Sequence, residues 1–192
     1  MAKPLDFDFL NAPAYEVAPQ LLGLILCRRI GNKQLLARIV ETEAYTQSDA
    51  ASHSYKGFTK RNSIMFGPSG YLYVYFTYGM HYCCNIVVGH PGDGSAVLIR
   101  AVEPLSGIDE METNRSSHSG VNLTNGPAKL CQALKIDIGL NGHNLRNSPF
   151  RLTPGNLVSN EEIFQTTRIG INSSKNTLWR FYINNNPYVS KK

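Results

Sequence analysis

An alternating run of aromatic and branched residues at positions 70–88 constrains the fold more than any other part of the sequence. Its first half alternates three tyrosines with three apolar residues: Tyr71, Leu72, Tyr73, Val74, Tyr75 and Phe76. A period of two indicates a β-strand whose apolar residues face a core and whose tyrosines line a second surface. Gly79 interrupts the run before it resumes at residues 81–88, so we predict a β-hairpin. Tyr78 and Met80 at its tip are larger than a plain turn requires, and this segment alone leaves open whether they pack in the core.

A second predicted strand, residues 34–45, carries two carboxylates near its end. A Gly31-Asn32 turn joins it to a preceding strand over residues 24–30. Its odd positions form one row: Leu35, Ala37, Ile39, Glu41, Glu43 and Tyr45. An apolar row that ends in two carboxylates and a phenol favours a strand that leaves the core and enters a site, although glutamate lies more often on a solvated face.

His53 and Arg100 are further candidate site residues. Residues 48–53 fit a short helical turn capped by Ser48, which carries His53 close to the end of the carboxylate-bearing strand. A lone histidine is more often structural than catalytic. Arg100 lies in a predicted buried strand, residues 96–102, where an arginine either extends its head group to solvent or pairs with a specific partner.

The rest of the chain predicts helices and late strands around this centre. Helices are expected at residues 17–23, 105–114 and from Pro127 onward, and late strands at 166–171 and 178–183. A length of 192 residues supports one substantial core, and no domain boundary is visible. We therefore expect a single domain, residues 1–192.

Charge and cysteine usage exclude several classes of protein. The formal charge of +5 and the pI of about 9.0 favour a polyanionic partner, though weakly. The four cysteines show no C-x-x-C spacing, so we expect neither a metal site nor a disulfide framework. The N-terminus lacks an apolar signal-peptide core and no long apolar run follows, which predicts a cytoplasmic protein without a membrane segment.

The candidate residues combine into one type of chemistry. A row of tyrosines suits stacking against a planar, electron-poor ring, because their faces are negative. A glutamate beside that row is able to act as a general base towards water. A large side chain at a turn is what a protein needs to enter a base stack and hold it open. Together these requirements describe base flipping and attack on the flipped nucleotide.

Several segments in order resemble the alkyladenine (3-methyladenine) DNA glycosylase family. They are residues 38–45 (R-I-V-E-T-E-A-Y), 72–75, 78–80, 92–94, 98–105 and 126–133, and the resemblance runs from about residue 10 to 189. It implies an α+β fold: a single domain with a curved, mainly antiparallel β-sheet, a protruding β-hairpin and surrounding helices.

The resemblance also implies an activity. It is that of a monofunctional hydrolase that initiates base excision repair without a metal, a cofactor or a lyase step. Such an enzyme flips alkylated or otherwise modified purines out of double-stranded DNA and hydrolyses the N-glycosidic bond by water attack on C1′. A monomer in the cytoplasm is expected, nucleoid-associated if the source is bacterial.

Carried over by motif, the resemblance gives roles to five residues of the pocket. Glu43 is the expected base that activates water. Arg100 is expected to steady the water, the site or the adjacent phosphate. Tyr45, His53 and Tyr75 are the expected walls for the flipped base, with His53 also a hydrogen-bond donor.

Three further residues match by position, and two segments depart from the family's pattern. Asn85 matches the residue that disfavours the exocyclic amine of normal guanine, Tyr78 matches the intercalating wedge, and Met80 lies beside it. Residues 114–125 are short with one arginine, where relatives often carry a longer basic stretch. His81 stands where relatives often have another aromatic residue, and its role stays open.

Two other functions remain possible from the residues. A non-catalytic nucleic-acid binder would use the tyrosines as a stacking platform. It would not need Glu43 there, because a carboxylate repels phosphate. A glycosidase pair formed by Glu41 and Glu43 is ranked last: same-face strand neighbours lie roughly 6.5–7 Å apart, near the spacing of inverting enzymes, but nothing else resembles a sugar cleft.

Overall fold

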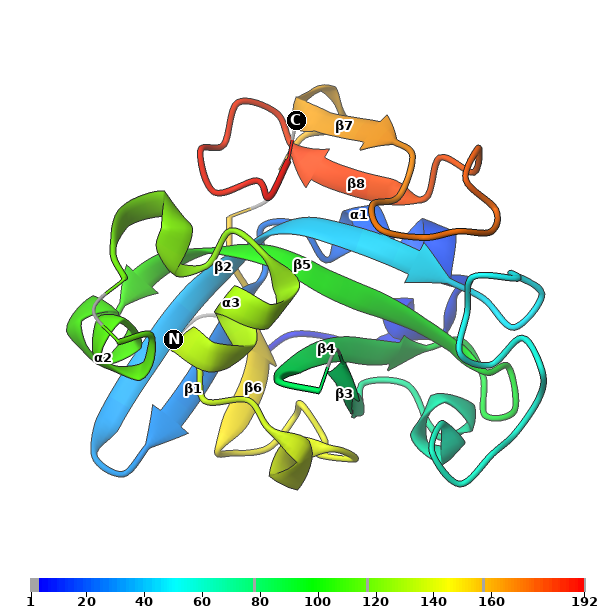
Figure 1. Cartoon of the computed structure of the whole chain (residues 1–192), viewed down its shortest axis with the longest axis horizontal. Helices are drawn as coiled ribbons and strands as arrows, with labels where there is room; N and C mark the ends of the chain where they lie inside the picture. Colours follow the sequence, from blue (N-terminus) through cyan, green and yellow to red (C-terminus); the bar gives the residue numbers. More distant parts are fainter. Residues whose placement is uncertain (1–3, 78, 117, 157, 192) are drawn as a thin grey trace.

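A curled antiparallel sheet carries the strands of this protein (Figure 1), and the computed structural model describes residues 4–77, 79–116, 118–156 and 158–191. Within these residues the sheet has eight strands. Six follow one path: β3 (Leu72–Thr77), β4 (His81–Val88), β5 (Ser95–Ser106), β2 (Lys33–Tyr45), β1 (Ile25–Ile30) and β6 (Phe150–Thr153). The other two, β7 (Ile163–Thr166) and β8 (Arg180–Ile183), pair with each other, and β8 also pairs with β2. The curved α+β fold expected from the family resemblance is confirmed.

Strand β2 is the strand on which the others converge. Its first half pairs with β1, most of its length pairs with β5, and its residues Glu41–Glu43 pair with β8. The register against β5 shifts on both sides of Glu41. Such a bulge bends a strand, increases its twist and re-aims side chains, and bulges are common next to functional sites. The carboxylate-bearing end of β2 is therefore shaped differently from its regular first half.

Three α-helices cover the sheet. They are α1 (Ala14–Gln20), α2 (Ile108–Asn114) and α3 (Pro127–Ala133), with short 3₁₀ segments at Asp8–Asn11, Ser63–Phe66, Gly120–Leu123, Ile138–Leu140 and Asn160–Glu162. In Figure 1, α1 lies behind β2 and β5 and α3 lies in front of β4 and β5, and both helices contact the sheet. α3 begins at Pro127 as predicted, because the fixed φ of proline suits a first helical turn, where its missing N–H costs nothing.

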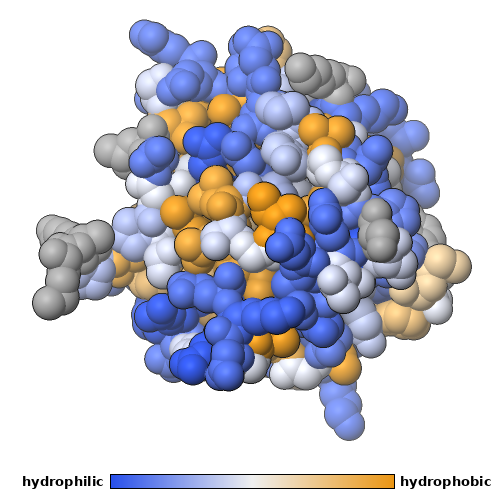
Figure 2. All heavy atoms as spheres, turned by 90° about the vertical axis from the view of Figure 1, so that its left-hand side faces the viewer, coloured by the Kyte–Doolittle hydropathy of each residue, from blue (hydrophilic) through white to orange (hydrophobic). Residues whose placement is uncertain are grey.

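Residues from both halves of the chain form the main core. Its fully buried members include Leu10, Val17, Leu35, Ile39, Ile99, Leu130 and Phe150. Burying one large apolar side chain contributes roughly 1.5–3 kcal/mol, so this cluster is the main source of stability. Figure 2 shows one face of the outer surface, where hydrophilic side chains surround smaller groups of hydrophobic ones. No helix in the described ranges combines the length and apolar character needed to span a bilayer.

Strands β3 and β4 form the predicted hairpin. Leu72 and Val74 are buried in the main core, as the alternation predicts. Phe76 on the same face is 48% exposed and packs beside the Tyr82 ring at 5.1 Å, because the hairpin extends beyond the core at its tip. Gly79 has a φ of +67° in that turn, a conformation that glycine adopts without strain.

Several predicted boundaries are wrong. The first helix is α1 at Ala14–Gln20 rather than residues 17–23. The predicted helix at 105–114 begins only at Ile108, because β5 continues to Ser106 and Gly107 breaks it with a φ of +74°. Residues 48–53 form consecutive turns, and the Ser48 hydroxyl bonds the Thr46 hydroxyl instead of capping a helix. The late strand predicted at 166–171 is β7, which ends at Thr166, and the loop after it enters the site described next.

Candidate active site

A cavity of about 380 Å³ opens where the ends of β2, β3, β4 and β5 meet. Its wall, which we call the base pocket, is lined mainly by aromatic and polar side chains. The lining residues include Tyr45, Ser52, His53, Met65, Tyr73, Tyr75, Asn85, Leu98, Arg100 and Ile169 to Ile171. Every described residue that we predicted for the walls of a base site, together with Asn85 and Arg100, lies in this one pocket.

Aromatic rings build one side of the pocket. The His53 ring lies 4.5 Å from the Tyr75 ring at a steep angle, and Tyr73 and Tyr75 lie 5.6 Å apart. His53 Nδ1 bonds the Tyr73 hydroxyl at 3.0 Å. Burial, and secondarily the charge of Arg61, lowers the pKa of His53, so the imidazole is neutral at pH 7. A neutral imidazole has one donor and one acceptor, and with Nδ1 occupied by Tyr73 the other nitrogen is free to bond a ligand.

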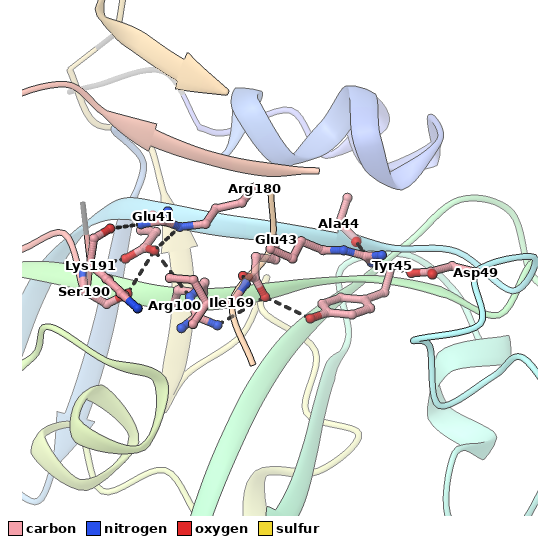
Figure 3. A network of polar contacts seen from close by, with 11 residues as sticks. Glu41, Glu43, Ala44, Tyr45, Asp49, Arg100, Ile169, Arg180, Ser190 and Lys191 are labelled. Atoms are coloured by element: carbon pink, nitrogen blue, oxygen red, sulfur yellow. Dashed lines mark hydrogen bonds and ion pairs between the residues drawn. The ribbon is translucent and has the colours of Figure 1, made fainter. Parts of the chain in front are cut away.

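Glu43 lies directly behind the pocket wall, fully buried (Figure 3). Its Oε2 accepts hydrogen bonds from the Tyr45 hydroxyl at 2.8 Å and Arg100 Nη1 at 3.2 Å, and its Oε1 accepts one from the Ile169 amide at 2.7 Å. All three donors belong to residues that line the cavity, whereas Glu43 itself does not line it. A carboxylate has about four lone-pair sites, so one site on Oε1 remains open.

Arg100 joins the two carboxylates of β2. Its Nη1 pairs with Glu43 at 3.2 Å, and its Nε lies 3.3 Å from Glu41 Oε1. Burial works against the guanidinium charge, but Glu43 and Glu41 together raise the pKa of Arg100. Of the two outcomes that the sequence allowed for this arginine, the structure selects pairing with specific partners.

Glu41 faces a different set of groups, which we call the Glu41 cluster: Glu41, Arg180 and Ser190. Arg180 Nε donates to Glu41 at 2.6 Å, and the Ser190 amide and hydroxyl donate at 2.7 and 2.9 Å. Arg180 also bonds the carbonyl of Lys191. Arg180 and Ser190 do not line the cavity, so Glu41 holds residues 190–191 against the sheet rather than facing the pocket.

Asn85 and Cys83 complete the pocket from β4. Asn85 Nδ2 donates to the Tyr73 carbonyl at 3.1 Å, which fixes the orientation of the buried amide. Burial raises the pKa of the Cys83 thiol to about 11, so it remains protonated beside Tyr75. The described residues contain no group of three or more histidine, cysteine or acidic side chains placed to hold a metal ion.

The hairpin tip carries the two wedge candidates. Met80 is 69% exposed, which rules out a core role for this residue. Tyr78 lies outside the residues that the structure describes, so its role as wedge stays a prediction. His81 Nδ1 is buried without a hydrogen-bond partner among the described residues. Its role remains open.

The single arginine of residues 114–125 is engaged within the protein. Arg115 bonds the Gln132 side chain and, at 3.3 Å, the Asn122 carbonyl. Its side chain therefore braces the segment before α3 instead of extending towards solvent.

Sequence reasoning missed the loop that follows β7. Ile169 supplies an amide to Glu43, and Gly170 has a φ of +74° that turns the loop along the pocket wall. Arg168, next to Ile169, pairs with Asp49, and both side chains are almost completely buried. A cation followed by alternating isoleucine and glycine carries no local signal for a site, because its importance comes only from distant partners.

This arrangement defines a class of protein. A pocket for one planar ring that is backed by a buried carboxylate and arginine, on a curled antiparallel sheet, is that of a DNA glycosylase that acts on a flipped base. The family model described as Methylpurine-DNA glycosylase (MPG) matches residues 8–187, and the chain belongs to this family.

Curated relatives match over nearly their whole length. A protein of Carboxydothermus hydrogenoformans is 54% identical over 177 residues, which cover 92% of this chain and 93% of that protein. Proteins of Francisella tularensis subsp. tularensis and Methanoculleus marisnigri are 50% identical over 186 residues (95% of this chain, 96% of that protein) and 45% identical over 191 residues (98% and 99%). All three carry the name "Putative 3-methyladenine DNA glycosylase". The family resemblance seen in the sequence is confirmed.

Proposed function

We propose that this chain is a monofunctional 3-methyladenine DNA glycosylase that acts as a monomer on double-stranded DNA and initiates base excision repair. The observation that carries the proposal is the position of Glu43, whose three hydrogen-bond donors all line the aromatic pocket. The family and the names of the relatives support the same activity.

The pocket suits one nucleobase. Its volume of about 380 Å³ is near the lower end of the roughly 300–1,000 Å³ typical of small-molecule sites. A flipped purine stacks against Tyr45, His53 and Tyr75 in this proposal. Alkylated purines such as 3-methyladenine are cationic as nucleotides, and the negative faces of the tyrosines attract them. Tyr73 donates to His53 Nδ1, which leaves the proton of the neutral imidazole on Nε2 as a donor to the base.

Bond cleavage follows from the placement of Glu43 and Arg100. A water molecule bonded to the open site of Glu43 attacks C1′ of the flipped nucleotide, and Glu43 takes its proton. The C1′–N9 bond breaks, and the purine leaves with the electron pair. For a cationic alkylated purine this departure gives a neutral base. Arg100 holds Glu43 in place through Nη1 and lines the cavity, so it fixes the direction of attack.

The absence of a lyase step is also part of the proposal. Lyase chemistry requires an amine that forms a Schiff base with the sugar. In the described wall of the pocket the residues are aromatic, polar or aliphatic, and the one cation is Arg100 rather than a lysine. We therefore expect an intact abasic strand as the product.

A base-release assay tests this function. Duplexes that carry methylated adenine, methylated guanine, hypoxanthine or ethenoadenine are incubated with the protein, and the free base and the strand are analysed separately. We expect a free modified purine and an uncleaved abasic strand, with no adduct trapped by borohydride. Tight binding of the lesions without base release would instead identify a non-catalytic binder that uses the tyrosines as a stacking platform.

A further inference from the structure

One buried arginine contacts every segment that surrounds Glu43 except β5. Arg168 Nη1 pairs with the Asp49 carboxylate and donates to the Ala44 carbonyl at 2.9 Å. Its guanidinium carbon lies 4.6 Å from the centre of the Tyr45 ring and 5.4 Å from that of Trp179. Arg168 is 6% exposed and does not line the cavity, so it acts on the pocket from behind.

Each contact of Arg168 leads to a group of the active site. Tyr45, under its guanidinium, donates to Glu43 at 2.8 Å. Ile169, the next residue along the chain, donates its amide to Glu43 at 2.7 Å. Two of the three donors to the carboxylate are therefore adjacent to this one side chain.

The Asp49 contact reaches the opposite wall. Asp49 Oδ1 accepts from the Ala51 amide at 3.1 Å, and its carbonyl accepts from the Ser52 amide at 2.9 Å. These bonds fix the turn that carries His53 into the pocket. The Asp49–Arg168 pair thus joins the loop of His53 to the loop of Ile169 across the end of β2.

Arginine suits this position better than lysine. A planar guanidinium is able to bind a carboxylate and a carbonyl while stacking on an aromatic ring, whereas an ammonium is a point charge that cannot stack. A buried ion pair contributes little net stability compared with apolar residues of the same volume. Stability alone therefore does not account for a charged pair directly behind the pocket.

We propose that Arg168 is a positioning residue, which holds Tyr45, the Ile169 amide and the His53 turn in the arrangement that Glu43 needs for base excision. This inference rests on the proposed glycosylase function. Displacing a reacting group by about 1 Å costs up to about 10²-fold in rate, so a small shift of these donors is sufficient to slow excision.

The main test is Arg168→Lys, which keeps the charge opposite Asp49 but removes the planar group. The matched control is Arg38→Lys, because Arg38 also pairs with a carboxylate, that of Glu103, but neither residue lines the pocket. We measure the single-turnover excision rate, the affinity for a duplex with a stable abasic-site analogue, and thermal unfolding. We expect excision to fall about 10- to 100-fold for Arg168→Lys with affinity within about threefold of wild type, and all three to stay near wild type for Arg38→Lys.

Tryptophan emission gives an independent measure of position. Trp179 is the one tryptophan of the chain, and it lies between the Arg168 guanidinium and the stacked ring of Tyr15. We expect its emission to change in Arg168→Lys and to stay unchanged in Arg38→Lys. The isosteric Asp49→Asn should slow excision in the same way, and combining it with Arg168→Lys should add less than the product of the single effects.

Two results would overturn the inference. One is an Arg168→Lys protein that excises within about threefold of wild type. The other is a rate that falls only in proportion to the folded fraction or to DNA affinity, which would make Arg168 structural alone. If Arg168→Lys does not fold, Asp49→Asn decides by the same criteria. A wild-type protein that releases no modified purine would instead contradict the proposed function itself.

Discussion

Glu41 and Glu43 are two buried carboxylates on the same face of one strand, and their surroundings differ. Both are fully buried and both lie within 3.3 Å of Arg100. The other partners of Glu41 are Arg180 and Ser190, outside the cavity, whereas those of Glu43 line it. The comparison teaches that burial and charge do not separate a structural carboxylate from a candidate catalytic one. What separates them is whether their donors face empty space that a substrate is able to fill.

This difference argues against the glycosidase pair. An inverting pair needs both carboxyl groups to face one substrate, with one of them free to protonate a leaving group. Glu41 accepts three hydrogen bonds from Arg180 and Ser190, and neither donor faces the pocket. A second carboxylate is therefore not available to the substrate.

Glu43→Gln should have the largest effect. The amide cannot take a proton from water, so base release should fall by roughly 10²-fold or more, the scale of a general base. Affinity for lesion DNA should stay nearly unchanged, because the side-chain volume is conserved. Single-turnover excision and binding measure the two quantities separately. Excision within a few-fold of wild type would remove Glu43 from the mechanism.

Glu41→Gln is the matched control, and its main effect should be on stability. The amide places a donor where Arg180 or Ser190 already donates, which costs about 1–3 kcal/mol for a buried unsatisfied group. Excision per folded molecule should fall by less than about tenfold, because Arg100 keeps its bond to Glu43. Urea unfolding together with excision tests this, and a loss of excision equal to that of Glu43→Gln would erase the contrast between the carboxylates.

Tyr78→Ala sharpens the comparison by separating flipping from bond cleavage. Unstacking a base costs a few kcal/mol, and an inserted side chain offsets part of it, so excision from paired duplexes should fall about tenfold. The fall should be much smaller when the lesion is in a bulge or opposite a mismatch, since its base is already unpaired. Met80→Ala, at the same tip, is the parallel variant. A lower melting temperature with equal loss on every substrate would place Tyr78 in the core.

The smallest expected effect concerns pH and His53. Because burial and Arg61 lower its pKa in the folded state, the unfolded chain binds a proton first as the pH falls. The stability contribution of neutral His53 is complete above about pH 6.5 and is lost as the pH drops towards the folded-state pKa. After allowance for solvent screening it amounts to less than about 1 kcal/mol. Melting temperatures at pH 7.5 and 5.5 should therefore differ less in His53→Gln than in wild type, and identical differences would contradict the lowered pKa.

Local patterns in the sequence predicted the elements that depend on neighbours in the chain. The β3–β4 hairpin follows from alternation around Gly79, and β1 and β2 follow from apolar runs around the Gly31-Asn32 turn. The start of α3 follows from Pro127. Periodicity, turn residues and helix starts act over a few residues, so these signals are present in the sequence itself. The family motifs added the candidate pocket residues, and those that the structure describes around the cavity lie together.

The partners of those residues were decided by the tertiary structure alone. The Ile169 amide that binds Glu43 lies 126 residues further along the chain, and Ser190 lies 149 residues from Glu41. The strand predicted at residues 166–171 shows the same limit, because an Ile-Gly-Ile segment suits a strand equally well until β8 and Glu43 fix its course. Which of two equivalent carboxylates faces a cavity depends on where the sheet curls and which loop covers it. No local propensity encodes that choice, because it arises from packing between segments far apart in sequence.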